Sequence, residues 1–155
     1  MLKAIHPAAG VAALLTITTF WLSTALSELF GSTSAVIAVK TAIPWGFLLL
    51  IPALAAAGGS GFALAGSAGD GRIGAKRRRM PIIAANGVLV LVPSALFLAA
   101  KARVGEFDLS FDLVQALELV AGAANITLLG LNLRDGLKLT GRIRGGASPE
   151  SKADA

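Results

Sequence analysis

Four long apolar stretches divide this chain, and each is free or almost free of charged residues. Residues 7–27, 41–69 and 80–100 carry no charge, and residues 113–133 carry a single one, at Glu118. A bilayer hydrocarbon core is about 30 Å thick and needs roughly 20 apolar helical residues to cross it. Backbone polar groups in lipid must be satisfied within the protein, so each stretch is predicted to be a helix. The pattern predicts an all-α fold, an integral membrane four-helix bundle with helices at 7–29, 36–68, 80–101 and 112–133.

The basic residues indicate how this bundle is oriented. With four spans, both termini and the connection between the second and third helices share one side, which holds 11 of the 14 Lys and Arg residues. Basic residues accumulate in cytoplasmic loops, so both termini are predicted to be cytoplasmic and the protein to lie in a bacterial inner membrane. The basic run at 72–79 fits this topology and contact with anionic lipid headgroups. Nucleic-acid binding is therefore not expected.

The domain organisation is simple. Residues 1–140 are predicted to form one transmembrane domain, and residues 141–155 a disordered polar tail. The first apolar stretch has a second interpretation as a cleaved signal peptide, which would remove His6. A signal peptide's apolar region is about 7–15 residues long, whereas this stretch has 21, so a transmembrane helix is favoured.

The absence of several residue types and motifs narrows the chemistry. The chain has no cysteine, which excludes disulfides, thiolate metal sites and a cysteine nucleophile. It has one histidine and lacks the GxSxG, HExxH and P-loop patterns. The sequence therefore does not indicate an enzyme.

Polar side chains form a stripe along the fourth predicted helix. The members recur at intervals of three or four residues, which places them on one helix face. Polar groups are costly in lipid, so this face is predicted to point into the bundle, where Asn86 of the third helix accompanies it. The stripe consists of Gln115, Glu118, Gly122, Asn125, Leu129 and Asn132.

The stripe has two interpretations. Its polar groups either hold the helices together, at about 0.6 kcal/mol per hydrogen bond, or they surround a functional site at Glu118. An ionisable residue inside a span favours a functional site. The candidate partners of Glu118 are Lys40 and Lys101 at the same depth, or a hydroxyl such as that of Ser23.

The histidine suggests a different chemistry at the other end of the bundle. His6 precedes the first helix, and the topology puts Met80 and Asn132 at the same depth. Imidazole and thioether are known axial ligands of haem iron, arginines can pair with the propionates, and glycine lets a porphyrin approach a helix. Alternatively, His6 of two chains shares one haem, or His6 is a hydrated side chain without a ligand. The residues of this candidate haem b site are His6, Met80, Arg78, Arg79, Asn132 and Gly87.

Three segments carry a family resemblance. KAIHPAAG, RRRMPIIAANG and LGLNLRDGLKL resemble segments of small four-helix bacterial inner-membrane proteins of uncharacterised function. The resemblance covers about residues 3–139. It implies a fold and a location, and it implies no activity.

These observations lead to three candidate functions. The first is a small haem-binding membrane protein, with His6 and Met80 as metal ligands, that serves electron transfer or haem handling. The second is a non-catalytic subunit or scaffold that packs into a larger membrane complex. The third is a proton-linked carrier that uses Glu118. The expected partners are membrane lipids and either further copies of the chain or a membrane protein.

Overall fold

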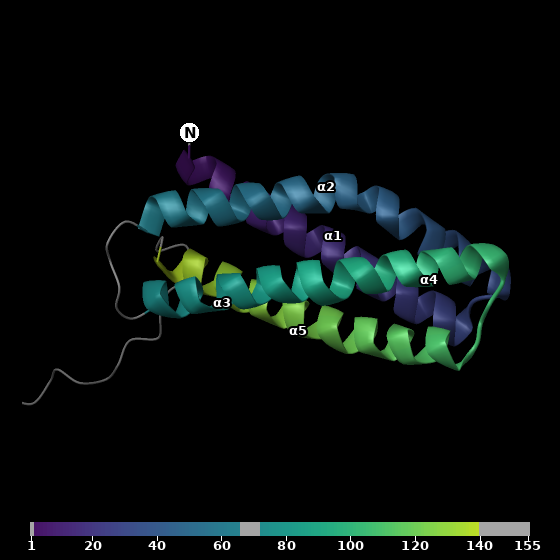
Figure 1. Cartoon of the computed structure of the whole chain (residues 1–155). Helices are drawn as coiled ribbons and strands as arrows, with labels where there is room; N and C mark the ends of the chain where they lie inside the picture. The colour runs from purple at the N-terminus through teal and green to yellow at the C-terminus, as the bar shows by residue number, and fades with distance from the viewer. Residues whose placement is uncertain (1, 66–71, 140–155) are drawn as a thin grey trace, which may run out of the picture.

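The chain folds into long helices that lie side by side (Figure 1). The computed structural model describes the backbone of residues 2–65 and 72–139, and no strand occurs in these ranges. The elements in chain order are α1 (Leu2–Phe30), α2 (Thr33–Ala65), α3 (Arg72–Asn86), the π-helical turn η1 (Gly87–Leu91), α4 (Val92–Val104) and α5 (Leu109–Leu139).

Four helical segments are long and apolar enough to cross a membrane. They are Ile5–Phe30, Thr33–Gly61, Arg79–Val104 and Leu109–Lys138, the third being a continuous rod of α3, η1 and α4. This confirms the prediction of an all-helical protein with four spans. The helices extend beyond most of the predicted ends. Residues 66–68 of the second predicted helix and the predicted tail at 141–155 lie outside the described residues.

The connections place both short loops at one end of the bundle. Residues 31–32 join α1 to α2, and residues 105–108 join α4 to α5. Figure 1 shows these loops together, whereas the start of α1, the start of α3 and the ends of α2 and α5 lie at the opposite end. We refer to the two as the loop end and the termini end.

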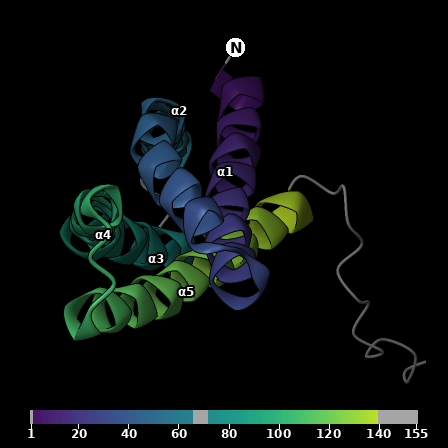
Figure 2. The same ribbon diagram turned by 90° about the vertical axis from the view of Figure 1, so that its right-hand side faces the viewer.

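The four spans pack in a ring, in which each span contacts its two neighbours. Helix α2 packs against α1 and α4, and α5 packs against α1 and against the α3–η1–α4 rod. Figure 2 shows this arrangement from the loop end. Within the described residues, α2 and α5 do not pack directly against each other. They occupy opposite corners, with the interior of the bundle between them.

The π-helical turn has a local cause in Pro93. Proline has no backbone N–H, and its ring clashes with the carbonyl four residues earlier in an α-helix. The chain avoids this clash by widening just before the proline, where the Val92 N–H bonds to the carbonyl of Gly87, five residues back. The rod therefore stays continuous and changes its helical phase in mid-span.

Two apolar clusters fill the interior away from its polar positions. At the loop end, the side chains come from α2, α4 and α5, and nearer the termini end they come from α1, α2, α3 and α5. Lipid tails are as apolar as these side chains, so apolar burial does little to hold membrane helices together. The polar contacts between the helices therefore carry much of the specificity. The clusters are Val36, Leu98, Ala102 and Phe111, and Ala13, Ile17, Leu50, Ala53, Ile83 and Leu129.

Candidate functional site

The polar stripe of α5 lies inside the bundle, as its spacing predicts. Gln115, Asn125 and Asn132 are each at most 7 % exposed. Glu118 is half-buried and Gly122 is buried. The stripe continues one step further than the sequence analysis took it, because Asp135 follows Asn132 by three residues and is also buried.

A buried charge pair crosses the interior near the loop end. Lys40 Nζ on α2 lies 2.7 Å from Glu118 Oε2 on α5, and the two side chains are 1 % and 13 % exposed. Because α2 and α5 occupy opposite corners of the ring, the long lysine side chain must reach across the bundle to make this contact. Lys40 is thus the partner of Glu118 among the candidates considered from the sequence. We call these two residues the central charge pair.

The central charge pair lies within the hydrocarbon depth of the helices. At a rise of about 1.5 Å per residue, the 31 residues of α5 span about 46 Å, and Glu118 lies about 14 Å from the start at Leu109. A hydrocarbon core of about 30 Å centred on such a helix begins about 8 Å from either end. Glu118 is therefore about 6 Å inside the core by this estimate.

Polar groups surround the pair on the side of the loop end. The buried Thr24 and Ser27 of α1 lie in this half of the bundle, and the Ser27 hydroxyl donates to the Thr24 carbonyl. Gln115, one turn before Glu118, is buried, and neither polar atom of its side-chain amide has a hydrogen-bond partner among the described residues. A buried amide without a hydrogen-bond partner costs about 1–3 kcal/mol.

Two further carboxylates lie towards the loop end of α1 and α5. Glu28 of α1 is within electrostatic range of Lys40, Asp112 and Glu118. Glu28 and Asp112 are exposed. The described interior therefore holds one lysine and one glutamate here, and Glu28 and Asp112 lie at the surface.

A cavity of about 50 Å³ adjoins Glu118 on the side of the termini end. Its walls are mostly apolar and include Phe20, Trp21 and Phe47. Trp21 Nε1 donates to the carbonyl of Leu119 at 2.8 Å. Gly122 allows this approach, because a Cβ atom there would lie 2.9 Å from Trp21 Cδ1.

A pair of asparagines joins the third span to α5 in mid-membrane. Asn86 Nδ2 donates to Asn125 Oδ1 and to the carbonyl of Ala121, both at 2.9 Å. Asn125 Nδ2 donates in turn to the carbonyl of Ile83 at 3.3 Å. We call Asn86 and Asn125 the asparagine clasp. Gly87, a residue of the candidate haem site, lies beside the clasp, since a Cβ at Gly87 would be 3.8 Å from Asn125 Nδ2.

The structure brings together part of the cluster predicted at the termini end. Asn132 Nδ2 lies 3.4 Å from Met80 Sδ and donates to it. Met80 also approaches α2, where a Cβ at Gly58 would lie 3.7 Å from its Cε. Arg79 forms an ion pair of 2.7 Å with Asp135. The side chain of Arg78 lies outside the described part of the structure.

His6 is held by α2. Its Nδ1 lies 3.0 Å from the carbonyl oxygen of Ala57 and 3.1 Å from Ser60 Oγ. A carbonyl only accepts, so Nδ1 is the protonated nitrogen of the ring. The edge of the imidazole lies against Gly61, where a Cβ would be 3.0 Å from His6 Cε1. A small residue is thus required for the histidine to dock.

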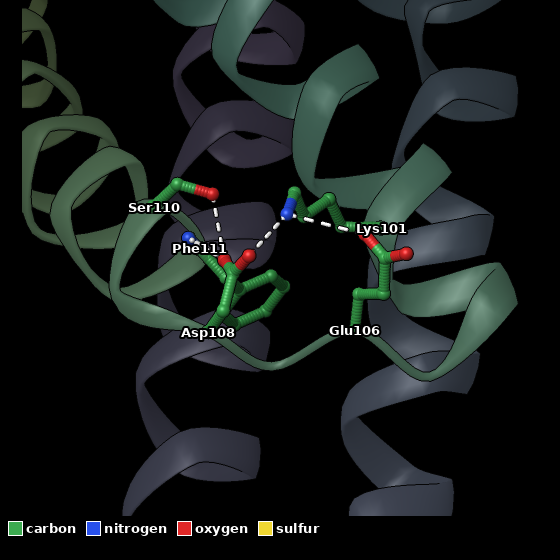
Figure 3. Close-up of polar contacts among 5 residues, drawn as sticks. All are labelled: Lys101, Glu106, Asp108, Ser110 and Phe111. Carbon is green, nitrogen blue, oxygen red and sulfur yellow. Dashed lines mark hydrogen bonds and ion pairs between the residues drawn. The ribbon is translucent and has the colours of Figure 1, made fainter.

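Lys101, the other sequence candidate for Glu118, belongs to the loop end instead. Figure 3 shows it between Asp108 and Glu106, with Nζ–O distances of 2.5 and 3.2 Å. The hydrogen bonds from Lys101, Ser110 and the Phe111 amide hold the pKa of Asp108 well below its usual range. The Phe111 contact also caps the start of α5.

The fold and these contacts define the class of the chain: it is a helical protein with four membrane-length helices, a polar interior and a charge pair within its spans. No protein family, curated protein or solved structure matches the chain. The resemblance to small bacterial inner-membrane proteins stays a prediction.

Ser60 and Asp135 were missed by the sequence analysis. Asp135 continues the spacing of the stripe, which would have revealed it. Ser60 lies among small residues in α2 and is distinguished only by its contact with His6.

Proposed function

We propose that the chain is a proton-linked membrane transport protein in which Glu118 accepts the proton and Lys40 is its counter-charge. The observation that carries this proposal is the 2.7 Å pair between two side chains that are 1 % and 13 % exposed and that lie within the hydrocarbon depth. Ionisable groups in such positions are rare and mark ion pathways and proton relays. The proposed location is a bacterial inner membrane with both termini cytoplasmic.

The proposed step is the making and breaking of one O–H bond. A proton from water at the loop end binds the Glu118 carboxylate, and the carboxyl becomes neutral. The salt bridge is lost, and Lys40 is left as a buried cation without its counter-charge. Because that state is unfavourable, the proton must leave again or a rearrangement must bring other groups to Lys40. One proton enters and one leaves, and no other bond changes.

The polar groups along α5 suggest the path that a proton would take to and from Glu118. Towards the loop end, the exposed Glu28 is within electrostatic range of both Glu118 and Asp112. On the other side of the cavity, the asparagine clasp and then Asn132 and Asp135 continue the polar face of α5 to the termini end. This succession supports a route along α5.

A purely structural role explains the pair less well. A buried ion pair is weak evidence for stability, because hydrophobic residues of similar volume often serve as well or better. A pair at opposite corners of the ring also requires a lysine that reaches across the interior. Transport gives a reason for keeping both charges.

The test is proton flux into liposomes that contain the purified protein. A potassium gradient with valinomycin sets the membrane potential, and a trapped pH-sensitive dye reports the flux. We expect flux in the wild type and its loss in Glu118→Gln. The control is Glu106→Gln, which removes a 61 % exposed carboxylate at the loop end. A wild-type flux equal to that of protein-free liposomes refutes the proposal.

Haem binding at His6 is a second candidate, favoured by a specific contact. Metal-bound histidines usually donate their second ring N–H to a carbonyl or carboxylate, and His6 Nδ1 has such a contact with Ala57. Iron would then bind Nε2. The thioether of Met80 accepts a hydrogen bond from Asn132, which makes His6 of a second chain the better second ligand.

The haem candidate is tested by the visible spectrum of the purified protein, oxidised and then reduced with dithionite. A Soret band with sharpened reduced bands, lost in His6→Ala, supports it. No band after expression with added haem refutes it. If both flux and haem are missing, the remaining interpretation is a non-catalytic subunit, which co-purification with a membrane partner tests.

A further inference from the structure

We infer that Gln115 captures the protonated form of Glu118. Once the Glu118 carboxyl has taken up its proton, it forms two hydrogen bonds with the side-chain amide of Gln115, and Lys40 is released. This inference deepens the proposed function and rests on it, because it gives a partner to the proton-carrying state of the same carboxyl. Gln115 acts through Glu118 and is therefore a positioning residue.

The amide of Gln115 is buried without a partner in the resting state. The side chain is 7 % exposed, and neither Nε2 nor Oε1 has a hydrogen-bond partner among the described residues. Buried polar groups in native proteins nearly always have a partner, and an exception calls for an explanation such as a role in the reaction. An amide that no contact holds in the resting state therefore points to a partner in a second state.

Gln115 lies close to the Glu118 carboxyl on the same helix. It precedes Glu118 by three residues in α5, and residues at this spacing are neighbours on one helix face, with Cβ atoms about 5–6 Å apart. Helical side chains lean toward the N-terminus of the helix and cover the preceding turn. The N-terminus of α5 is at the loop end (Figure 1), so Glu118 leans toward the turn that carries Gln115. A change of side-chain rotamers is then enough to join the two groups.

The hydrogen-bonding capacity of the amide matches the protonated carboxyl. An ionised carboxylate only accepts, whereas a protonated carboxyl has one O–H donor and a carbonyl oxygen that accepts. A glutamine amide offers the complementary pair, a carbonyl oxygen and an N–H. Two parallel hydrogen bonds therefore satisfy both atoms of Gln115 that are without a partner. The amide oxygen gains nothing from the ionised form, so Gln115 favours the protonated state of Glu118.

The charged groups around Glu118 do not offer the same contact. Lys40 of α2 holds the ionised carboxylate, but an ammonium group only donates and cannot accept the new O–H. The lysine of α4 pairs with the loop carboxylates instead. Glu28 of α1, which is within electrostatic range of Glu118, and Asp112 of α5 are both exposed. Gln115 is the buried acceptor on the same face of α5.

The proton step stays balanced with this contact included. Water at the loop end gives up one proton, one O–H bond forms on Glu118, and the hydrogen bond from Lys40 to Oε2 breaks. The new O–H donates to Gln115 Oε1, and Gln115 Nε2–H donates to the carbonyl oxygen of the carboxyl. Both hydrogen bonds break when the proton leaves, and Lys40 then returns to the carboxylate.

The test uses the fact that Gln115 is the only glutamine of the chain. A ¹³C and ¹⁵N label in glutamine, introduced by cell-free synthesis, reports on this amide alone in NMR spectra of the protein in detergent micelles. Spectra are recorded in neutral and in mildly acidic buffer for the wild type and for Lys40→Met, in which no lysine competes with the proton. The matched control is Lys40→Met/Glu118→Leu, which keeps Gln115 and removes the carboxyl.

We expect the side-chain carbonyl resonance of Gln115 to move downfield in acidified Lys40→Met, as it does when a carbonyl accepts a hydrogen bond. The double variant should show no such shift at either pH, and its resonance should match that of the wild type in neutral buffer. A shift that is present in the double variant, or absent from acidified Lys40→Met, overturns the capture of Glu118.

A second measurement is the effect of Gln115→Leu on unfolding by SDS. In the wild type in neutral buffer the substitution should leave the unfolding midpoint unchanged or raise it, because it removes an amide without a partner. In acidified Lys40→Met it should lower the midpoint, because it removes the partner of the carboxyl. A purely structural glutamine would give the same sign in both. A lower midpoint in the neutral wild type overturns the inference, and this arm needs no variant of Lys40.

The outcomes separate this inference from the proposed function. If Glu118-dependent proton flux is found but the Gln115 resonance does not respond to acid in Lys40→Met, only the capture by Gln115 fails. If the resonance responds and the response requires Glu118, the capture stands even where no flux is found, and then only the transport proposal fails.

Discussion

Removing either member of the central charge pair should destabilise the protein in a way that depends on pH, with opposite slopes for the two members. Lys40→Met leaves Glu118 without its counter-charge in the interior. The carboxyl can escape this situation by binding a proton. Removing one partner of a buried pair costs about 3–5 kcal/mol, because the remaining charge is left uncompensated.

The loss of stability should depend on pH. For Lys40→Met it should be smaller near pH 5 than near pH 7, because acid favours the neutral carboxyl. Glu118→Gln leaves a buried lysine, and its loss should be smaller near pH 9 than near pH 7, because alkali favours the neutral amine. Acid should therefore rescue Lys40→Met, and alkali should rescue Glu118→Gln.

The assay is unfolding in mixed micelles of a mild detergent and SDS, followed by tryptophan fluorescence at the three pH values. The double variant Lys40→Met/Glu118→Leu is the control, since replacing a buried pair by apolar residues is often neutral or stabilising. Its stability should be nearly independent of pH over this range. Equal pH slopes for the two single variants, or no loss of stability in either, would refute a buried and mutually dependent pair.

Three further predictions concern the helix contacts. Gly46→Ala should destabilise the protein by about 1–3 kcal/mol, because its Cβ would overlap the ring of Phe20. Gly59→Ala should be neutral in the same unfolding assay, because a Cβ there would have nothing within 4 Å. In a double-mutant cycle, alanine at Asn125 and Asn86 should show a coupling of about 0.6–1.7 kcal/mol, and no coupling would contradict the asparagine clasp. The lowered pKa of Asp108 means that its contacts stabilise the loop above about pH 3.9 and are lost as the pH falls further; an NMR titration showing an ordinary carboxyl would contradict this.

The sequence was sufficient to predict which face of α5 is inside. The helical period and the cost of polar groups in lipid suffice to identify this face, and the structure buries Gln115, Asn125 and Asn132 accordingly. The partner of Glu118 was harder to choose. By depth in the membrane, both Lys40 and Lys101 could pair with Glu118. Only the arrangement of the four helices shows that Lys40 reaches across the interior, whereas Lys101 pairs with the carboxylates of the loop.

For the cluster at the termini end, too, the sequence predicts the depth of the residues but not their contacts. Topology places His6, Met80 and Asn132 at one depth, but depth does not determine which neighbour each side chain faces. The structure joins Met80 to Asn132 and docks His6 on Ala57 of α2. The helical phase of the third span adds to the difficulty, because the π turn before Pro93 rotates everything that follows it.

The contacts that α5 makes with the other helices differ in kind, and under the proposed transport function this difference favours α2 as the element that moves. Neutral hydrogen bonds join α5 to α1 through Trp21 and to the third span through the asparagine clasp, and no proton is needed to keep or break them. The ion pair of Asp135 lies at the termini end, beyond the hydrocarbon depth by the same helix-rise estimate, with its arginine 25 % exposed. The described tie between α2 and α5 is the central charge pair, which a single proton on Glu118 undoes. Since these two helices do not pack directly on each other, protonation would release α2 from α5 without breaking a packed interface.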